Sequence, residues 1–418
     1  MKVKVLKKDN RFSTRNDTAL GIQHYGEGND YPQQLMQVVA ASGTGGSCID
    51  VYSKFISGKG FADKEFYRKT VNSKGQTNDY ILDQISKDYA MFGGFALHVN
   101  YNAHFQITEI QYIPFEHVRF EKMDENGHFG KVAIHWDWGR QFGQLRRWKK
   151  EDIDFIHFYN PNPEIINFQV QEAGGWNFYK GQVFYYSSAG EKTYPTPIYD
   201  SVATDMNTEE GISNVNNRNA RNNFFSSGMF IDKKNTDESK EQENDTEKAV
   251  KEFQGDENAC KMMYVQIESD EEKPEFVSFK GENYDKEFEV TRKTVQDNIG
   301  KRFNQPPILR AENVGANFGA DLMKNAYNYY NSVVENERLA IERVFAQIFK
   351  NWFEATNDDY AIFPLSYDVE MNLAEQLGEK GFEQLMKILE NPNLQPEQKR
   401  RMIKRLFNLL DEEINDLL

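Results

Sequence analysis

The feature that most constrains the fold is a pair of hydrophilic helical stretches that bracket a short strand-rich segment. The first stretch, residues 198–227, has helical periodicity but a thin apolar stripe, since it carries seven asparagines: Asn207, Asn214, Asn216, Asn217, Asn219, Asn222 and Asn223. A helix with so little apolar surface cannot occupy a dry core. We therefore expect it to be solvated or to pack beside copies of itself.

The second stretch, residues 284–303, has one apolar side and a cationic remainder. The apolar residues are Phe288, Val295, Ile299 and Phe303, and the cations are Arg292, Lys293, Lys301 and Arg302. Between the two stretches we expect strands at 228–231, 261–267 and 275–279, a short helix at 247–253 and a charged loop at 233–245. Two helices thus flank a small α/β insertion that projects from them.

The region before residue 198 has the pattern of an α+β domain. Helices are expected at 31–57, interrupted around Gly43, Gly45 and Gly46, and at 78–92. Strand patterns follow, punctuated by Gly, Asn and Pro, at 95–101, 107–113, 117–121, 132–138, 153–159 and 183–186. This order predicts a mainly antiparallel sheet with helices on it. The glycine run lacks the Lys-Ser/Thr pair of a phosphate loop, which argues against phosphate binding there.

After residue 304 the chain returns to helix. Pro306 and Pro307 end the second polar helix, and a loop of small and polar residues follows at 312–319. Residues 321–353 have the periodicity of one helix of roughly 50 Å. A strand is expected at 361–369 and amphipathic helices at 373–418, the last of which should assemble.

Composition excludes several classes of protein. Fifty Lys and Arg against 65 Asp and Glu give a formal charge of −15, which disfavours a surface that grips nucleic acid tightly. The two cysteines, Cys48 and Cys260, predict neither a disulfide framework nor a zinc site. No signal peptide or membrane-spanning stretch is evident, so we expect synthesis in the cytosol.

Motifs for catalysis are missing. The seven histidines are scattered without metal-ligand spacing, and no hydrolase or kinase signature occurs, so no catalytic residue, metal or cofactor is predicted. The alternative is a carbohydrate-active enzyme or glycan-binding protein with an aromatic-rich sheet. In that case Asp137 and Asp154 would act as acid and base beside four tryptophans: Trp136, Trp138, Trp148 and Trp176.

Six local motifs resemble those of the portal proteins of tailed double-stranded DNA phages, in the short siphophage and prophage type. Three lie in the first domain: Tyr89-Ala-Met-Phe-Gly-Gly-Phe95, Ile113-Pro-Phe-Glu-His-Val-Arg119 and Tyr194-Pro-Thr-Pro-Ile-Tyr199. The others are Asn222-Asn-Phe-Phe-Ser-Ser-Gly-Met-Phe230, Phe303-Asn-Gln-Pro-Pro-Ile308 and the glycine-rich loop before residue 321. Their shared order and spacing over residues 31–353 carry the resemblance.

The resemblance implies the portal fold and its domains. These would be an α+β wing at 1–197, a stem helix at 198–227, a small α/β clip at 228–281, a second stem helix at 282–304, a tunnel loop at 305–320, a long helix with a returning wing strand at 321–370, and a helical crown at 371–418. Such a subunit is not an enzyme. It forms a ring-shaped channel for genome packaging and ejection, as a dodecamer, at one capsid vertex of the virion, after assembly in the host cytoplasm. A head-tail connector ring of another kind is disfavoured by the length of the chain.

The resemblance also implies partners and a DNA-facing site. Double-stranded DNA would pass without sequence preference, and the large terminase, a head-tail adaptor, the major capsid protein and a scaffold would bind the ring, with no membrane involved. Gln305, Asn313 and Asn317 would face DNA from the tunnel loop. The candidate channel cations are Arg292, Lys293, Lys301 and Arg302, which would add modest attraction to phosphates. A solvated helix face is an equal interpretation of these four.

Overall fold

The computed structural model describes residues 13–138, 148–190, 194–221, 228–233, 262–267, 275–278, 284–310, 320–356, 359–367, 385–389 and 396–407. The chain divides into two units. The first comprises residues 1–318 and 325–365, and the second comprises 319–324 and 366–418. Each unit is described by itself.

An eight-stranded sheet forms the centre of the first unit. Its order is β1-β2-β5-β6-β7-β8-β3-β4, with every pair antiparallel except β7 and β8. The strands are β1 (Asn16–Asp17), β2 (Ile22–Gln23), β3 (Gly94–Tyr101), β4 (Ile107–Ile113), β5 (Val118–Glu121), β6 (Lys131–Ile134), β7 (Asp154–Phe158) and β8 (Gln182–Ser187). This confirms the predicted α+β class and the mainly antiparallel sheet. The short strands β1 and β2 were not predicted.

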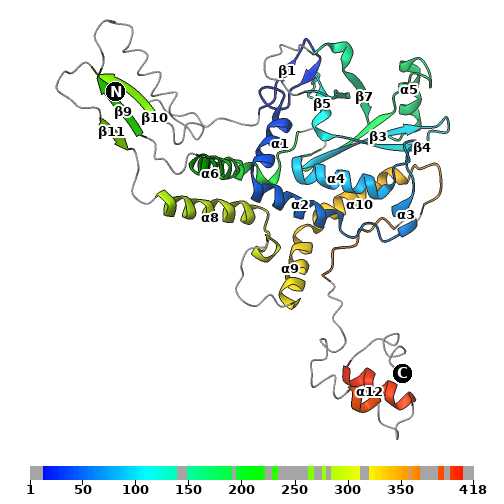
Figure 1. The fold of residues 1–418 in the computed structure, drawn as a ribbon. Coiled ribbons are helices and arrows are strands. Elements are labelled where there is room, and N and C mark those ends of the chain that lie inside the picture. Colours follow the sequence, from blue (N-terminus) through cyan, green and yellow to red (C-terminus); the bar gives the residue numbers. More distant parts are fainter. Residues whose placement is uncertain are drawn as a thin grey trace. The chain divides into compact units, whose positions relative to one another are not determined.

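Helices cover this sheet, as Figure 1 shows. They are α1 (Tyr31–Ala41), α2 (Gly43–Ser57), α3 (Lys64–Arg68), α4 (Asn78–Phe92), α5 (Pro163–Ala173) and α10 (Glu335–Phe349). α4 packs on β3 and β4 through buried residues such as Ile81 and Ile85, and α2 packs on α4. The predicted helix at 78–92 is therefore confirmed. The predicted helix at 31–57 is broken at Ser42, before the glycines, which lie in the first two turns of α2.

The long helix expected at 321–353 is wrong in one respect. The segment forms two helices, α9 (Ala320–Val333) and α10, separated at Val334 with φ −98° and ψ 10°. The side chain of Arg338 donates to the carbonyl of Asn331 at 2.7 Å, which satisfies a carbonyl at the end of α9. The helical period of the sequence continues across the break, so periodicity alone does not reveal it.

The strand expected at 361–369 is reduced to a single antiparallel bridge between Ile362 and Phe61. Lys59 and Ala62 donate to the carbonyls of Phe363 and Ala361, both at 2.8 Å. The segment thus pairs with the turn after α2 rather than joining the large sheet. Residues 368–370 lie outside the described residues.

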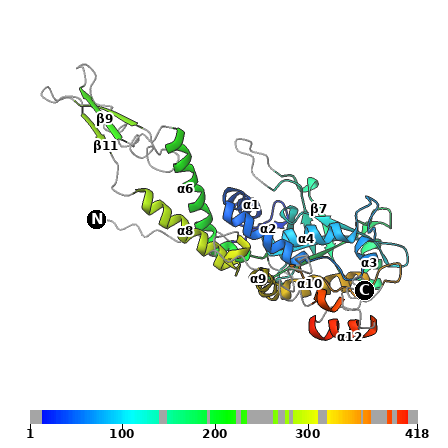
Figure 2. The same cartoon turned by 60° about the horizontal axis from the view of Figure 1, so that its bottom comes forward.

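The two polar helices are present as predicted. They are α6 (Ala203–Arg221), which follows a short 3₁₀ helix η3 (Ile198–Val202), and α8 (Tyr284–Arg302), and they lie side by side in Figures 1 and 2. Between them in the chain is a three-stranded sheet of β9 (Gly228–Lys233), β10 (Met262–Ile267) and β11 (Glu275–Ser278). β9 is central, parallel to β10 and antiparallel to β11. The helix expected at 247–253 and the charged loop lie outside the described residues, except for Lys233 at the end of β9.

After residue 367, the second unit is described over two helical segments, residues 385–389 and α12 (Pro396–Phe407). Leu385, Ile388 and Ile403 are buried, whereas Met386 and Met402 are exposed. This alternation fits the predicted amphipathic helices.

Candidate functional site

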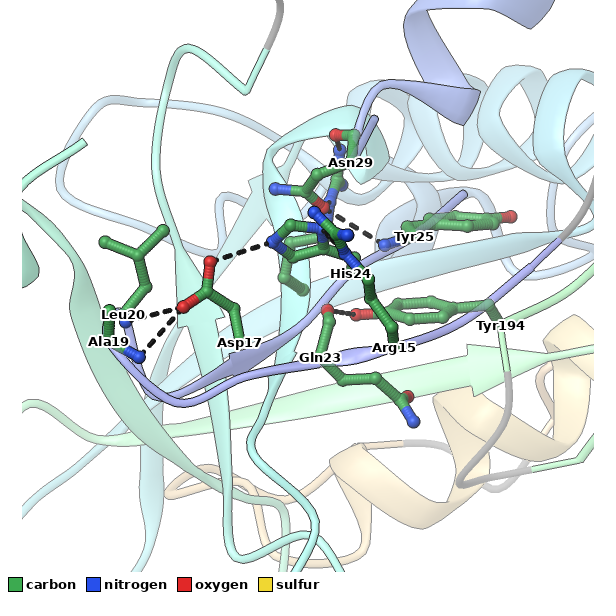
Figure 3. Close-up of polar contacts among 10 residues, drawn as sticks. Arg15, Asp17, Ala19, Leu20, Gln23, His24, Tyr25, Asn29 and Tyr194 are labelled. Atoms are coloured by element: carbon green, nitrogen blue, oxygen red, sulfur yellow. Dashed lines mark hydrogen bonds and ion pairs between the residues drawn. The ribbon is translucent and has the colours of Figure 1, made fainter. Parts of the chain in front are cut away.

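Three segments that are distant in sequence meet where the chain leads into α6. The hydroxyl of Tyr194 accepts a hydrogen bond from the backbone N–H of Phe120 at 2.7 Å. The same hydroxyl donates to the carbonyl of Gln23 at 2.8 Å, as Figure 3 shows. Tyr25 stacks on Tyr194 with ring centroids 4.1 Å apart and donates to the Pro195 carbonyl. These contacts hold the chain against the sheet just before η3.

The same junction connects further motifs singled out in the sequence. Tyr199 donates from its hydroxyl to the carbonyl of Met91 at 2.6 Å. Tyr31 donates to the carboxylate of Asp200 at 2.7 Å. Phe92 of the 89–95 motif also stacks on Phe115 of the 113–119 motif, so these two motifs and the 194–199 motif meet where the chain leads into α6.

Arg119 is the buried charge of this junction. Its side chain is fully buried and donates to the side chain of Asn29 at 2.6 Å, to the Asn29 carbonyl at 2.8 Å and to the carbonyls of Glu116 and Val118. The guanidinium also lies over the rings of Tyr25 and Trp138. Burial lowers the pKa of Arg119 to about 10, which leaves it charged at neutral pH. Oriented carbonyl dipoles and aromatic faces stabilise that charge.

The N-terminal hairpin holds a histidine with two partners. Arg15 donates to Nδ1 of His24 at 3.4 Å, and Nε2 of His24 lies 3.2 Å from the carboxylate of Asp17 (Figure 3). Asp17 also accepts from the backbone N–H groups of Ala19 and Leu20. Burial and the charge of Arg15 lower the pKa of His24. Both ring nitrogens are occupied, so this cluster stabilises the hairpin and offers no base.

The polar helix α6 contacts the start of α2. We call the three residues there, Ser42, Thr44 and Gly45, the α6 seat. Ser42 donates from its hydroxyl to Oε2 of Glu209 on α6, and Thr44 donates from its backbone N–H to the same oxygen at 3.2 Å. The Thr44 hydroxyl donates to Oε1 at 2.6 Å. A helix N-terminus stabilises an anion, and here that anion is the chain's own carboxylate.

The seat explains the glycine run without a phosphate. A Cβ added to Gly45 would lie 2.8 Å from Cε of Met206 and 2.9 Å from the hydroxyl of Ser42, so glycine allows α6 to approach α2 closely. Met206 is fully buried there. Burial would raise the pKa of Glu209, but the hydrogen bonds from Ser42 and Thr44 outweigh it and lower that pKa.

The second polar helix, α8, also contacts Glu209. Nε2 of Gln296 on α8 lies 3.4 Å from Oε1 of Glu209, and the Gln296 backbone carbonyl accepts from Nη1 of Arg310 at 3.3 Å. A Cβ on Gly300 would fall 1.2 Å from Nη1 of Arg310, so the arginine crosses α8 at the glycine. Arg310 ends the 3₁₀ helix η5 (Pro307–Arg310).

Of the three residues predicted to face DNA from the loop, the structure describes only Gln305. Gln305 is buried and donates from its side-chain amide to the carbonyl of Cys48 at 2.6 Å and to the hydroxyl of Tyr330 at 3.1 Å. Its side chain therefore braces α2 and α9, which corrects the expectation that it faces outward. Asn313 and Asn317 lie outside the described residues.

The four predicted channel cations are exposed on α8. Arg302 donates to the carbonyl of Ile198 and so helps to hold η3. Lys293 and Lys301 belong to a stripe at four-residue spacing, in which Glu289 and Asp297 alternate with them. Residues four apart share one helix face, so this stripe carries no net charge and would attract phosphates only weakly.

The carbohydrate alternative does not fit the tryptophan positions. Trp138 is fully buried and donates to the carbonyl of His117 at 2.8 Å, while Trp148 packs on it and donates to the carbonyl of Asp137 at 2.7 Å. Trp176 instead pairs with Phe105 and Tyr179. Trp136 is exposed whereas Trp138 is buried, so the four rings do not form one exposed sugar-binding platform.

Within the described ranges, no group of three or more His, Cys, Asp or Glu side chains is arranged to hold a metal ion. In that same part of the chain, no helix is both long and apolar enough for a membrane span.

Comparison with known proteins gives structural matches alone. No protein-family model matches the chain, and no curated protein matches it in sequence. The chain is similar to a chain of the virion of a native gene transfer agent particle, with 14% identity, a TM-score of 0.42 and coverage of 91% of this chain and 93% of that one.

Two other matches are of the same kind. One is a chain from the neck of the native gene transfer agent particle computed with C12 symmetry, with 13% identity, a TM-score of 0.43 and coverage of 89% and 93%. The other is an HK97 family phage portal protein from Corynebacterium diphtheriae, with 11% identity, a TM-score of 0.37 and coverage of 70% and 82%. A phage portal protein is thus among the solved structures that this chain resembles.

Proposed function

We propose that the chain is a portal subunit, which assembles with identical copies into a ring-shaped channel for the passage of DNA. The observation that carries the proposal is the pair α6 and α8, two polar helices joined in the chain through a small three-stranded sheet and anchored on an α+β domain. Six consecutive residues of α8, numbers 289–294, are exposed. Helices gain most of their stability from packing, so a second copy would supply the missing contacts.

In this proposal the sheet domain is the wing, α6 and α8 are the stem, and the three-stranded sheet is the clip. The ring would hold twelve copies, the number that the sequence resemblance implies, at one vertex of the virion capsid. The large terminase and a head-tail adaptor would bind at the clip, and the major capsid protein and a scaffold would surround the wing. The role is mechanical rather than catalytic.

Weak contact with DNA would suit such a channel. The charge of −15 opposes tight binding of a polyanion, and the alternating stripe on α8 adds no net attraction. We propose that DNA contacts come instead from the 305–320 loop through Asn313 and Asn317. Neutral amides give shallow contacts that are independent of base sequence and break easily.

Assembly is the direct test. Size-exclusion chromatography with light scattering, and negative-stain micrographs of purified protein and of capsids, should reveal an annulus containing this chain. Protein that stays at the mass of one chain, together with capsids that lack such an annulus at a vertex, would contradict the proposal.

The loop assignment has its own test. Asn313→Lys with Asn317→Lys should leave the ring intact and reduce packaged DNA, because added cations bind phosphates too tightly for passage. Asn126→Lys adds a cation at an exposed turn of the sheet domain and serves as the control. Equal packaging by both variants would remove the loop assignment.

A further inference from the structure

Glu209 joins three elements through one carboxylate. Its two oxygens accept from Ser42 and Thr44 in the α6 seat and from Gln296 on α8. The next residue, Glu210, is exposed. Because adjacent residues on a helix point about 100° apart, only the first of these two glutamates reaches α2.

We propose that Glu209 is the positioning residue that fixes the α6–α8 pair on the sheet domain, as a removable carboxylate cap on the first turn of α2. Apart from this carboxylate, α6 packs on α1 and α8 packs on α2, and at the seat itself the thioether of Met206 lies against Gly45. An unbranched thioether packs in many orientations and defines no unique angle. Hydrogen bonds to a carboxylate are directional and stronger than those between neutral groups, so they set the angle.

The contact chain continues beyond the seat. Gln296 approaches Glu209 with its side chain and accepts from Arg310 with its backbone carbonyl. Arg310 is the last described residue before 311–319. A change at Glu209 should therefore be felt at two places, the first turn of α2 and η5. In a ring, the angle of the helix pair would also set the width of the bore, and this last consequence rests on the proposed function.

Hydrogen exchange of the full-length chain tests the role of Glu209. Glu209→Gln keeps the shape of the side chain but leaves one acceptor oxygen in place of two and removes the charge. The amides of Thr44 and Gly45 should then exchange about tenfold faster, since opening of the seat costs less. Peptides covering 307–310 should also exchange faster.

Glu210→Gln is the matched control, because it makes the same chemical change one residue away on the exposed side. It should leave both regions at the wild-type rate. Equal exchange in the two variants, with both folded by circular dichroism, would overturn the proposal.

A second variant distinguishes the loss of this one contact from a general loss of stability. Thr44→Val removes the hydroxyl that binds Oε1, and combining it with Glu209→Gln should accelerate exchange at η5 no further than Glu209→Gln alone, because both act on one contact. Fully additive effects would overturn the proposal. Micrographs separate this inference from the proposed function: a wild-type chain that never forms rings contradicts the function alone, while rings in every variant with equal exchange overturn the role of Glu209.

Discussion

Arg338 of α10 donates from Nη2 to the backbone carbonyl of Asn331, 2.7 Å away, across the point where α9 ends. Nη1 of the same guanidinium donates to the side chain of Asn331 at 3.2 Å and to the Phe55 carbonyl at 3.0 Å on α2. In a continuous helix the Asn331 carbonyl would pair with the N–H four residues later. The arginine takes that role, so one side chain holds the break and ties it to α2.

Replacement of this arginine should be costly. Arg338→Met keeps most of the apolar stem but leaves two buried carbonyls without their donor, so we expect a loss of about 3 kcal/mol in the free energy of unfolding. Arg343→Met on the exposed side of α10 is the control and should change stability little. Urea unfolding measures both. Equal midpoints for the two variants would show that the guanidinium contributes nothing at the break.

The turn after α2 gives a second prediction, based on two glycines with positive φ. Gly58 has φ 57°, and a Cβ there would fall 2.1 Å from the Phe363 carbonyl. Gly75 has φ 77° with nothing within 4 Å. Both alanine variants incur the cost of a positive φ, about 1 kcal/mol or more. Gly58 combines φ 57° with ψ −143°, which lies outside the left-handed helical region, and only Gly58→Ala adds a clash with backbone. Gly58→Ala should therefore be the less stable variant by thermal unfolding. If both variants lost the same stability, the 359–363 segment would be able to move away from the added Cβ at no cost in free energy.

The fold was predictable where local pattern decides it. Helix periodicity identified α4 and α8, and alternation with turn residues identified the strands from β3 to β8. The interruption between α1 and α2 was expected from the glycines, whereas the break at Val334 was not predicted. The break at Val334 depends on Arg338, which lies on a continuous helical period, so the sequence pattern carries no sign of it.

The site was predictable in outline only. The polar character of α6 indicated a helix that does not occupy a dry core, and the motifs around Tyr194 and Arg119 marked positions that meet at its base. The carboxylate that seats the helix was missed, since Glu209 and Glu210 are indistinguishable in the sequence until the direction of each side chain is known. Gln305 was placed outward because the portal resemblance assigns it to a loop that faces DNA, whereas here its amide donates to a buried carbonyl.

A buried carboxyl predicts a dependence of stability on pH. Asp88 on α4 is buried, accepts from the Phe115 backbone N–H at 3.1 Å and hydrogen-bonds Tyr112. Burial, assisted by the charge of Glu116, raises its pKa well above the ordinary value of 3.8. The folded chain then holds a proton that the unfolded chain has lost, so this residue's contribution to stability falls as pH rises from 3.8 through the raised pKa.

Asp88→Asn should remove that dependence. Asparagine keeps an acceptor for Phe115 without a charge, so the variant should gain stability relative to wild type as pH rises above 3.8 toward the raised pKa of Asp88. Chemical unfolding across that range measures the difference. Asp83→Asn, on the same helix and paired with Lys87 at the surface, is the control. A constant difference between Asp88→Asn and wild type would contradict the assignment.

The charge stripe on α8 gives a prediction for DNA contact. If Glu289 and Asp297 screen Lys293 and Lys301, then replacing both lysines with glutamine should barely alter the binding of double-stranded DNA by assembled rings. Replacing the two acids, by Glu289→Gln with Asp297→Asn, should instead strengthen binding, because two cations become available to phosphates. The dependence of log affinity on log salt should then steepen by up to about 1.8, at roughly 0.9 for each phosphate contact.

Fluorescence anisotropy over a salt series measures these slopes. Both double variants keep residues that form helices, so we expect the rings to assemble, and size-exclusion chromatography checks this. A slope that falls by a similar amount when the lysines are removed would mean that they already contact phosphates in the wild type. The stripe would then attract DNA in the wild type. Glu289 and Asp297 would in that case interact with the neighbouring copy rather than screen the two lysines. If the stripe is neutral, replacing the two acids changes DNA affinity more than replacing the two lysines. Tight DNA binding by α8 does not produce that order.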